Sequence, residues 1–325
     1  MAAIDLDEYE QGVTSGHRAW LGRAITLVES TKPEHQDLAQ ELLTRLLPAA
    51  GGAVRVGVSG APGAGKSTLI DSLGTYLTGS GHKVAVLAVD PSSTRSGGSI
   101  LGDKTRMDRL SVDPDAFIRP SPTAGTLGGV TRTTRETMVI VEAAGYDTVI
   151  VETVGVGQSE ITVAGMVDTF CVLALARTGD SLQGIKRGIL ELADVVAVNK
   201  ADGPHRLDAE STAVELADAL RLMTPHGQPV APVIPVSGLE SWNLDKLWAE
   251  ITGHRQALAD RGELAAKHQR QQVEWMWSMV DEAVLGRVRH HPEVKRLTAE
   301  LEAAVTAGEC TPTVAARRLL TAAAS

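Results

Sequence analysis

The chain is poor in aromatic residues, in cysteine and in surplus positive charge. Aromatic side chains make up only 3% of its 325 residues, too few for the exposed stacking platform that single-stranded nucleic-acid binding requires. The two cysteines, Cys171 and Cys310, lie far apart, which excludes a disulfide framework and a zinc site built on cysteine. The formal net charge of −9 argues against a general electrostatic grip on nucleic acid or on an anionic membrane.

Long apolar runs are also missing, and we expect no secretory leader. No stretch approaches the 18 apolar residues that a membrane-spanning helix needs, and the first segment, MAAIDLDEYEQG, is acidic where a signal peptide is basic. Hydrophobic residues (43%) and charged residues (22%) are present in ordinary globular proportions. We therefore expect a cytoplasmic protein in a reducing compartment, with no membrane span and no nucleic-acid partner.

What the sequence does contain is a change of pattern along its length. Residues 1–50 carry apolar side chains at helical spacing up to Pro48 and the Gly51-Gly52 pair, which predicts an N-terminal helical extension. Residues 51–262 contain short apolar runs separated by helical stretches, the pattern of an α/β domain with a mostly parallel central sheet. The expected strands are 54–59, 84–89, 148–152, 169–176, 195–199 and 232–237. Residues 263–325 contain only helical spacing and are predicted to form a helical arm.

A phosphate-binding loop follows the first predicted strand. The sequence GAPGAGKST fits G-x-x-x-x-G-K-[ST], with a strand before it and a helix after it. Backbone N–H groups in such a loop turn toward phosphate oxygens, and the helix N-terminus adds positive potential. Lys66 is predicted to reach the β- and γ-phosphates and Ser67 to ligate Mg²⁺. The candidate nucleotide-binding residues here are Gly60, Ala61, Pro62, Gly63, Ala64, Gly65, Lys66, Ser67 and Thr68.

A second motif indicates which base is bound. Asn199-Lys200-Ala201-Asp202 follows a predicted strand and fits N-K-x-D, the guanine-reading motif of GTPases. The Asp202 carboxylate can accept from guanine N1–H and the 2-amino group together, a donor pair that adenine lacks, while Lys200 lies over the base. Ser237, Gly238 and Leu239 end a later strand and are predicted to form a second loop beside the base. GTP and GDP are therefore the expected ligands.

Acidic residues at other strand ends are candidates for the Mg²⁺ side of the site. Glu152 ends the strand at 148–152, and Gly155 after it is expected to sense the γ-phosphate through its N–H. Asp90 and Asp103 lie on a long polar loop that begins where the strand at 84–89 ends, a type of loop that is usually functional or disordered. The alternatives are purely structural: Asp90 only starts a proline turn, and Glu152 only ends a strand.

Several longer strings resemble one family. GAPGAGKST, DPSS with SGGSILGDKTRM, GTLGG, TRETM, VETVGVGQSE, LQGIKRGILELAD and NKAD together are similar to the methylmalonyl-CoA mutase-associated GTPases of the MeaB/ArgK type, over roughly residues 10–290. The resemblance implies a homodimeric, Mg²⁺-dependent GTPase that acts as a chaperone for an adenosylcobalamin-dependent acyl-CoA mutase, gating cofactor loading and protecting the mutase.

Within this resemblance, individual residues take on roles. Ser67, Asp90, Asp103 and Glu152 fall at metal or switch positions, and Lys66, Glu152 and Asp103 are the candidate catalytic residues. Residues 179–187 fall in a third mobile loop, where Ala176-Arg177-Thr178 and Ser181 depart from the more Gly/Ala-rich, acidic stretch of many members. Two other functions stay open: a P-loop kinase or transport-associated ATPase, and a metal-insertion GTPase. The scattered histidines, without cysteine beside them, disfavour the last of these.

Overall fold

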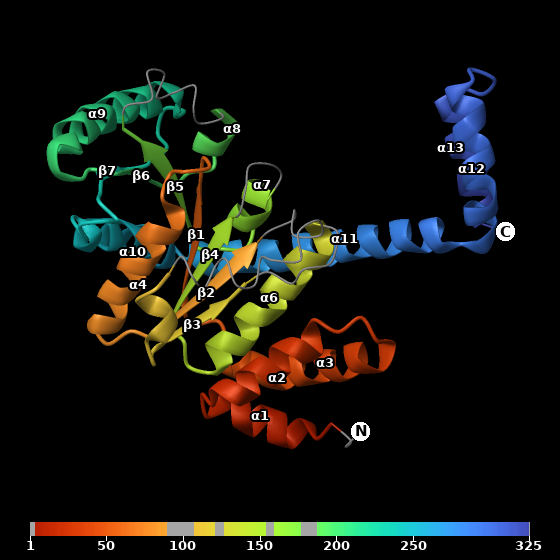
Figure 1. Ribbon diagram of the computed structural model, residues 1–325, viewed down its shortest axis with the longest axis horizontal. Helices are drawn as coiled ribbons and strands as arrows, with labels where there is room; N and C mark the ends of the chain where they lie inside the picture. The colour runs from red at the N-terminus through yellow and green to blue at the C-terminus, as the bar shows by residue number, and fades with distance from the viewer. Residues whose placement is uncertain (1–3, 90–106, 121–126, 154–158, 177–186, 325) are drawn as a thin grey trace. The chain divides into compact units, whose positions relative to one another are not determined.

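The computed structural model describes residues 4–89, 107–120, 127–153, 159–176 and 187–324 (Figure 1). The chain divides into two compact units, Met1–Lys267 and His268–Ser325. The first unit contains a sheet covered by helices, and the second contains helices only among its described residues. Asp90, Asp103 and Gly155 lie outside the described residues, as does most of the predicted third loop.

A seven-stranded sheet forms the centre of the first unit. Its order is β3-β2-β4-β1-β5-β6-β7, and all six strand pairs are parallel, as the near-continuous apolar runs predict. The strands are β1 (Val54–Gly60), β2 (Val84–Val89), β3 (Ala116–Arg119), β4 (Thr148–Thr153), β5 (Thr169–Leu175), β6 (Val195–Asn199) and β7 (Val233–Pro235). Because parallel strands all end at one edge, the segments after β1, β4 and β6 meet there.

Strand β3 is the one strand that the sequence pattern does not predict. Its four residues, AFIR, pair with the beginning of β2, where Ala116 lies opposite Val84. Only Ala116 is fully buried, because β3 lies at the border of the sheet. A four-residue strand with one buried side chain leaves too short an apolar run to be recognised locally.

Two separate cores lie on the two faces of the sheet. Side chains alternate along each strand, so that Val56 and Val58 of β1 join the core under α4 (Lys66–Gly79) and α10 (Leu244–Asp260). The other core lies beneath the remaining helices of this unit, where Phe170 is the largest of the fully buried side chains. Those helices are α1 (Leu6–Thr14), α2 (Arg18–Val28), α3 (Pro33–Leu46), α6 (Leu127–Ala143), α7 (Ser159–Ala164), α8 (Arg187–Leu190) and α9 (Arg206–Met223).

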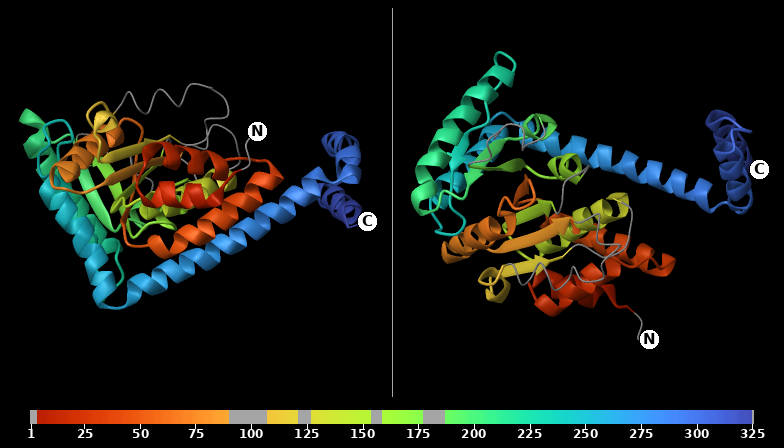
Figure 2. Two further views of the ribbon diagram at one scale, coloured as in Figure 1. Left: turned by 90° about the horizontal axis from the view of Figure 1, so that it is seen from below. Right: turned by 45° about the horizontal axis from the view of Figure 1, so that its top comes forward.

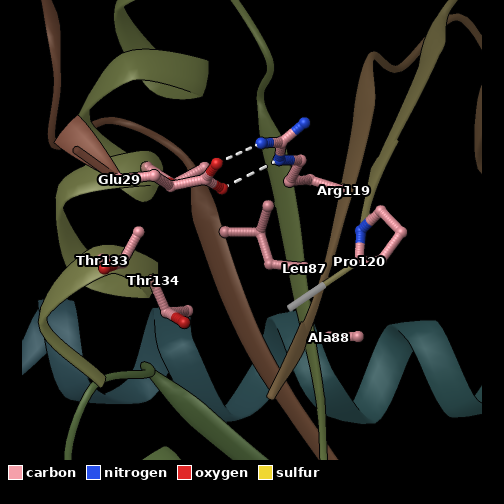
Figure 3. A pocket seen from close by; sticks show the side chains of 8 residues that line it. Glu29, Leu87, Ala88, Arg119, Pro120, Thr133 and Thr134 are labelled. Atoms are coloured by element: carbon pink, nitrogen blue, oxygen red, sulfur yellow. Dashed lines mark hydrogen bonds and ion pairs between the residues drawn. The ribbon is translucent and has the colours of Figure 1, made fainter. Parts of the chain in front are cut away.

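The N-terminal helices form an extra layer on this second face. Helices α2 and α3 pack on α6, and Figure 2 shows α1–α3 gathered on the side of the sheet that α6 covers. Gln40 of α3 donates to Glu136 Oε1 of α6 at 2.8 Å, and burial raises the pKa of this carboxyl. Arg119, at the end of β3, forms a two-pronged ion pair with Glu29, which follows α2 (Figure 3). Polar contacts therefore fix the helical extension to the sheet.

A charged network closes the opposite edge of the sheet, where the strands begin. Asp168 is fully buried just before β5, and its Oδ2 accepts from the Arg55 N–H and from Arg255 Nε, both at 3.1 Å. Lys267 Nζ donates to the Asp168 carbonyl oxygen at 2.7 Å. The buried carboxylate is therefore compensated by a backbone N–H and a guanidinium, as a charge in an interior requires. Lys267 fixes the first turn of α11 (Glu263–His290) to this edge.

The second unit contains the rest of α11 together with α12 (Pro292–Thr306) and α13 (Pro312–Ala323). Helices α12 and α13 pack as a hairpin around Val294, Leu301 and Ala315. Most of the charged stretch at 260–272 lies inside the continuous helix α11. Among the described helices, none combines the length and the hydropathy that crossing a membrane requires.

Candidate nucleotide site

The phosphate-binding loop joins the end of β1 to the start of α4, as predicted. Gly65 immediately precedes α4 with φ at 85°, and a Cβ atom there would lie 2.7 Å from Asn199 Nδ2. A Cβ atom on Gly60 would lie 2.7 Å from the carbonyl oxygen of Leu173 in β5. Both contacts are shorter than real Cβ atoms show, so the loop needs glycine for its packing as well as for its turn.

Lys66 lies against this loop. Its Nζ donates to the carbonyl oxygen of Gly60 at 2.8 Å and to that of Ala61 at 3.4 Å. Burial lowers the pKa of Lys66, while the carboxylates of Glu152 and Glu160 act in the opposite direction. The ammonium group is therefore held at the mouth of the loop in an environment that favours an added negative charge.

Glu152 lies next to Ser67, as a metal site would require. Strand β4 pairs with β1, with Glu152 opposite Val58, and this register brings the carboxylate to the start of α4. Ser67 Oγ donates to Glu152 Oε1 at 3.1 Å, and Glu152 is only 5% exposed. A hydroxyl and a carboxylate are the hard oxygen ligands that Mg²⁺ prefers, so these two side chains fit the ion.

Asn199 connects the phosphate side of the site to its base side. At the end of β6, its Nδ2 donates to the Ala64 carbonyl oxygen at 2.8 Å. Its Oδ1 accepts from the Gly238 N–H at 3.1 Å. Because Asn199 is 2% exposed and both ends of its amide are used, it fixes the distance between the two loops.

The other base-side residues gather at the same place. The Ser237 hydroxyl hydrogen-bonds Asp202 Oδ1 and also accepts from the Glu240 N–H at 2.8 Å. Because the Ser237 oxygen accepts from the Glu240 N–H, the Ser237 proton can be donated to Asp202. These two hydrogen bonds of Ser237 therefore orient the Asp202 carboxylate. Lys200 is exposed and has φ at 67°, and the side chain of Leu239 is also exposed. The structure thus brings the predicted residues of the N-K-x-D motif together with residues 237–239.

Three elements of this site were not predicted from the sequence. Glu160, in the first turn of α7, is 2% exposed and acts on the charge of Lys66. Thr153 Oγ1 donates to Ser59 Oγ at 2.9 Å, which ties the end of β4 to the end of β1. Glu160 belongs to the string VETVGVGQSE, so the motif carried a signal for it. The third element is Arg109, which no local signal marks and whose side chain donates to Asp71 and Ser72 of α4.

The sequence profile described as "Methylmalonyl Co-A mutase-associated GTPase MeaB" matches residues 21–293. A "Probable GTPase" of Mycobacterium tuberculosis is 58% identical over 98% of this chain and 97% of its own length. The mouse protein "Methylmalonic aciduria type A homolog, mitochondrial" is 46% identical over 98% of this chain and 79% of its own.

Among solved structures, one described as "LAO/AO transport system kinase" superposes with a TM-score of 0.78. It is 37% identical and covers 98% of this chain and 99% of its own. These matches cover most of the chain, and the matched structure agrees with its fold, a parallel sheet with a glycine loop at its edge. The chain belongs to the MeaB family and is a P-loop GTPase.

Proposed function

We propose that the protein is a GTP-hydrolysing chaperone that gates adenosylcobalamin loading into an acyl-CoA mutase, such as methylmalonyl-CoA mutase, and protects that mutase. The observation that carries the proposal is the match, over most of the chain, to a family whose description names mutase association. The name of the mouse relative, which refers to methylmalonic aciduria, supports the same client. Hydrolysis then acts as a timer for the complex and not as a route to a product.

The residues of the site receive roles in this proposal. Lys66 holds the β- and γ-phosphates, and Asp202 with Lys200 reads guanine beside residues 237–239. Ser67 and Glu152 would hold Mg²⁺, whose charge neutralises the phosphates when the ion is bound. Asp90 and Asp103 are proposed as further acidic ligands, and Asp103 with Lys66 and Glu152 as the catalytic set. The hydrogen bond between Ser67 and Glu152 supports the first pair of metal ligands.

The partner can be tested with purified mutases. We expect the protein to retain a cobalamin-dependent acyl-CoA mutase in a pull-down, with retention that differs between GDP and a non-hydrolysable GTP analogue. We also expect the mutase to accelerate GTP turnover, because P-loop GTPases alone hydrolyse at about 10⁻⁴ to 10⁻² s⁻¹. An unrelated acyl-CoA enzyme is the control. Fast GTP turnover by the protein alone, unchanged by any mutase, would contradict the proposal that hydrolysis times the complex.

A second candidate function follows from the structural relative described as a transport system kinase. A kinase would pass the γ-phosphate to an acceptor protein or metabolite, not to water. The hydrogen bond between Ser237 and Asp202 favours guanine as the base. ATP use with transfer of labelled phosphate to a protein, in the same incubations, would favour the kinase.

We also propose that the protein is a homodimer joined through its C-terminal arm, and that it works in the cytoplasm. Helix α11 carries apolar side chains at helical spacing that remain between 42% and 58% exposed: Val273, Met276, Trp277, Val280 and Val284. A contiguous apolar stripe of this kind usually meets a partner. A second copy of the same stripe is an equally apolar surface, and a stable interface would bury more than roughly 1,000 Å².

Charged substitutions on this stripe test the dimer. Light scattering of the full chain should give twice the 34.2 kDa of one protomer. The double substitution Trp277→Glu and Val284→Glu should give a single protomer, because four like charges would face one another across the interface. Leu222→Glu, at an apolar position of α9 that is 89% exposed, is the control and should stay dimeric. A stripe variant that remains dimeric would refute pairing through the arm.

A further inference from the structure

Arg109 connects the segment before η3 (Leu110–Val112) to the phosphate-loop helix α4. Its Nε donates to Asp71 Oδ2 at 2.9 Å, and the Leu110 N–H donates to Asp71 Oδ1 at 2.9 Å. Asp71 is only 7% exposed and both of its carboxylate oxygens accept hydrogen bonds, whereas the Arg109 side chain is 50% exposed. This arrangement fixes the direction of the Arg109 guanidinium over α4.

The same guanidinium determines where the Ser72 proton points. Arg109 Nη2 donates to Ser72 Oγ at 2.5 Å, and Ser72 Oγ is hydrogen-bonded to the carbonyl oxygen of Gly238. A guanidinium can only donate and a carbonyl can only accept. The single proton of the hydroxyl is therefore directed to Gly238, while its lone pair faces Arg109. Ser72 is 2% exposed and the Arg109 side chain is 50% exposed, so water reaches the guanidinium but has little access to the hydroxyl.

Gly238 in turn is held by both of its backbone groups. Its N–H bonds Asn199 and its carbonyl oxygen bonds Ser72, while a Cβ atom on it would lie 2.9 Å from Leu69 Cα. The loop of residues 237–239 thus lies directly on α4, and Ser72 is the contact that Arg109 controls. The hydroxyl of the adjacent Ser237 orients the Asp202 carboxylate.

We propose that Arg109 is a positioning residue for guanine recognition, acting through Ser72 on the Gly238 carbonyl. This inference rests on the proposed role of residues 237–239 as the base-side loop. A charged donor strengthens the hydroxyl's bond to the carbonyl, because hydrogen bonds in a chain polarise one another. Loss of Arg109 frees the Ser72 proton to turn and loosens the base-side loop. It leaves the phosphate loop in place.

The experiment is a double-mutant cycle read by calorimetric GDP binding. Arg109→Met and Ser72→Ala should each weaken GDP binding about fivefold to tenfold, the range expected for one hydrogen bond. The double variant should be no weaker than Ser72→Ala, because Arg109 acts through that hydroxyl. Pyrophosphate, measured by competition, should bind all three like the parent chain, since it touches only the phosphate loop. Arg221→Met removes an exposed arginine–aspartate pair on α9 and is the control.

Additive losses, or an equal loss of pyrophosphate binding, would show that Arg109 only fixes its own segment to α4. If Arg109→Met lowers the melting temperature, Arg109→Lys takes its place, because lysine keeps the charge but lacks the fork that reaches Asp71 and Ser72 together. The Asp202→Asn variant distinguishes a failure of the base-side-loop assignment from a failure of the proposed role of Arg109. If it leaves GDP binding unchanged, the assignment of the base-side loop fails. If it abolishes GDP binding while the cycle is additive, only the role of Arg109 fails.

Discussion

Asp202→Asn is expected to convert the protein from guanine to xanthine nucleotides. The carboxylate accepts from N1–H and the 2-amino group of guanine, and the amide replaces one of these acceptors with a donor. Xanthine has a carbonyl at position 2, so the new donor is matched there and unmatched in guanine. We expect GDP binding to fall by about 10²- to 10⁴-fold, the range for a buried polar pair left without its partner. Calorimetry with GDP and XDP measures both changes.

The matched control is Asp245→Asn, which alters an exposed aspartate in the first turn of α10 and should leave both affinities unchanged. The Asp202→Asn variant keeps one side-chain carbonyl oxygen that can accept the hydrogen bond from Ser237, so the loop itself should keep its position. Equal binding of ATP and GTP by the unaltered protein would be fatal to the guanine assignment. So would an Asp202→Asn variant that binds GDP normally.

Lys66→Ala is expected to abolish GTP hydrolysis, with a loss of at least about 100-fold. Removing one charge-stabilising donor from a site where negative charge develops costs about 10²- to 10³-fold. Phosphate release under saturating GTP measures the rate. Lys246→Ala removes an exposed lysine of α10 and should hydrolyse GTP normally. A Lys66→Ala variant that melts at the parent's temperature yet still turns over GTP would exclude this lysine from catalysis.

The lowered pKa of Lys66 predicts how nucleotide binding depends on pH. Burial lowers the pKa of Lys66 in the free protein, and a bound diphosphate raises it again by adding negative charge. Lys66 therefore holds its proton more tightly in the GDP-bound state, and GDP affinity should be greatest below the pKa that Lys66 has in the free protein. It should then fall as the pH rises through that value. The Lys66→Ala variant should lose the part of this alkaline decline that comes from the lysine, and calorimetric titrations of both proteins across neutral and alkaline pH would reveal the difference.

The parts of the site formed by residues close together in the chain were predictable from the sequence. The loop from Gly60 to Thr68 is a continuous segment whose glycines, lysine and hydroxyls have fixed spacing, and the structure has it between a strand and a helix. Asn199 and Asp202 are likewise placed by their own strand. The parallel sheet was predictable because strands covered on both faces read as apolar runs. Strand β3 was missed because a border strand with one buried residue leaves no such run.

Contacts between distant segments were decided only by the tertiary structure. Ser67 and Glu152 are 85 positions apart, and the pairing of β4 with β1 brings them within hydrogen-bond distance. Arg109 lies 37 positions from Ser72, and Gly238 lies 166 positions from it, yet the three form one chain of bonds. Local patterns record which side chains are buried and how the backbone turns. They do not record which strands become neighbours, since that depends on how all the segments fill the two faces of one sheet together.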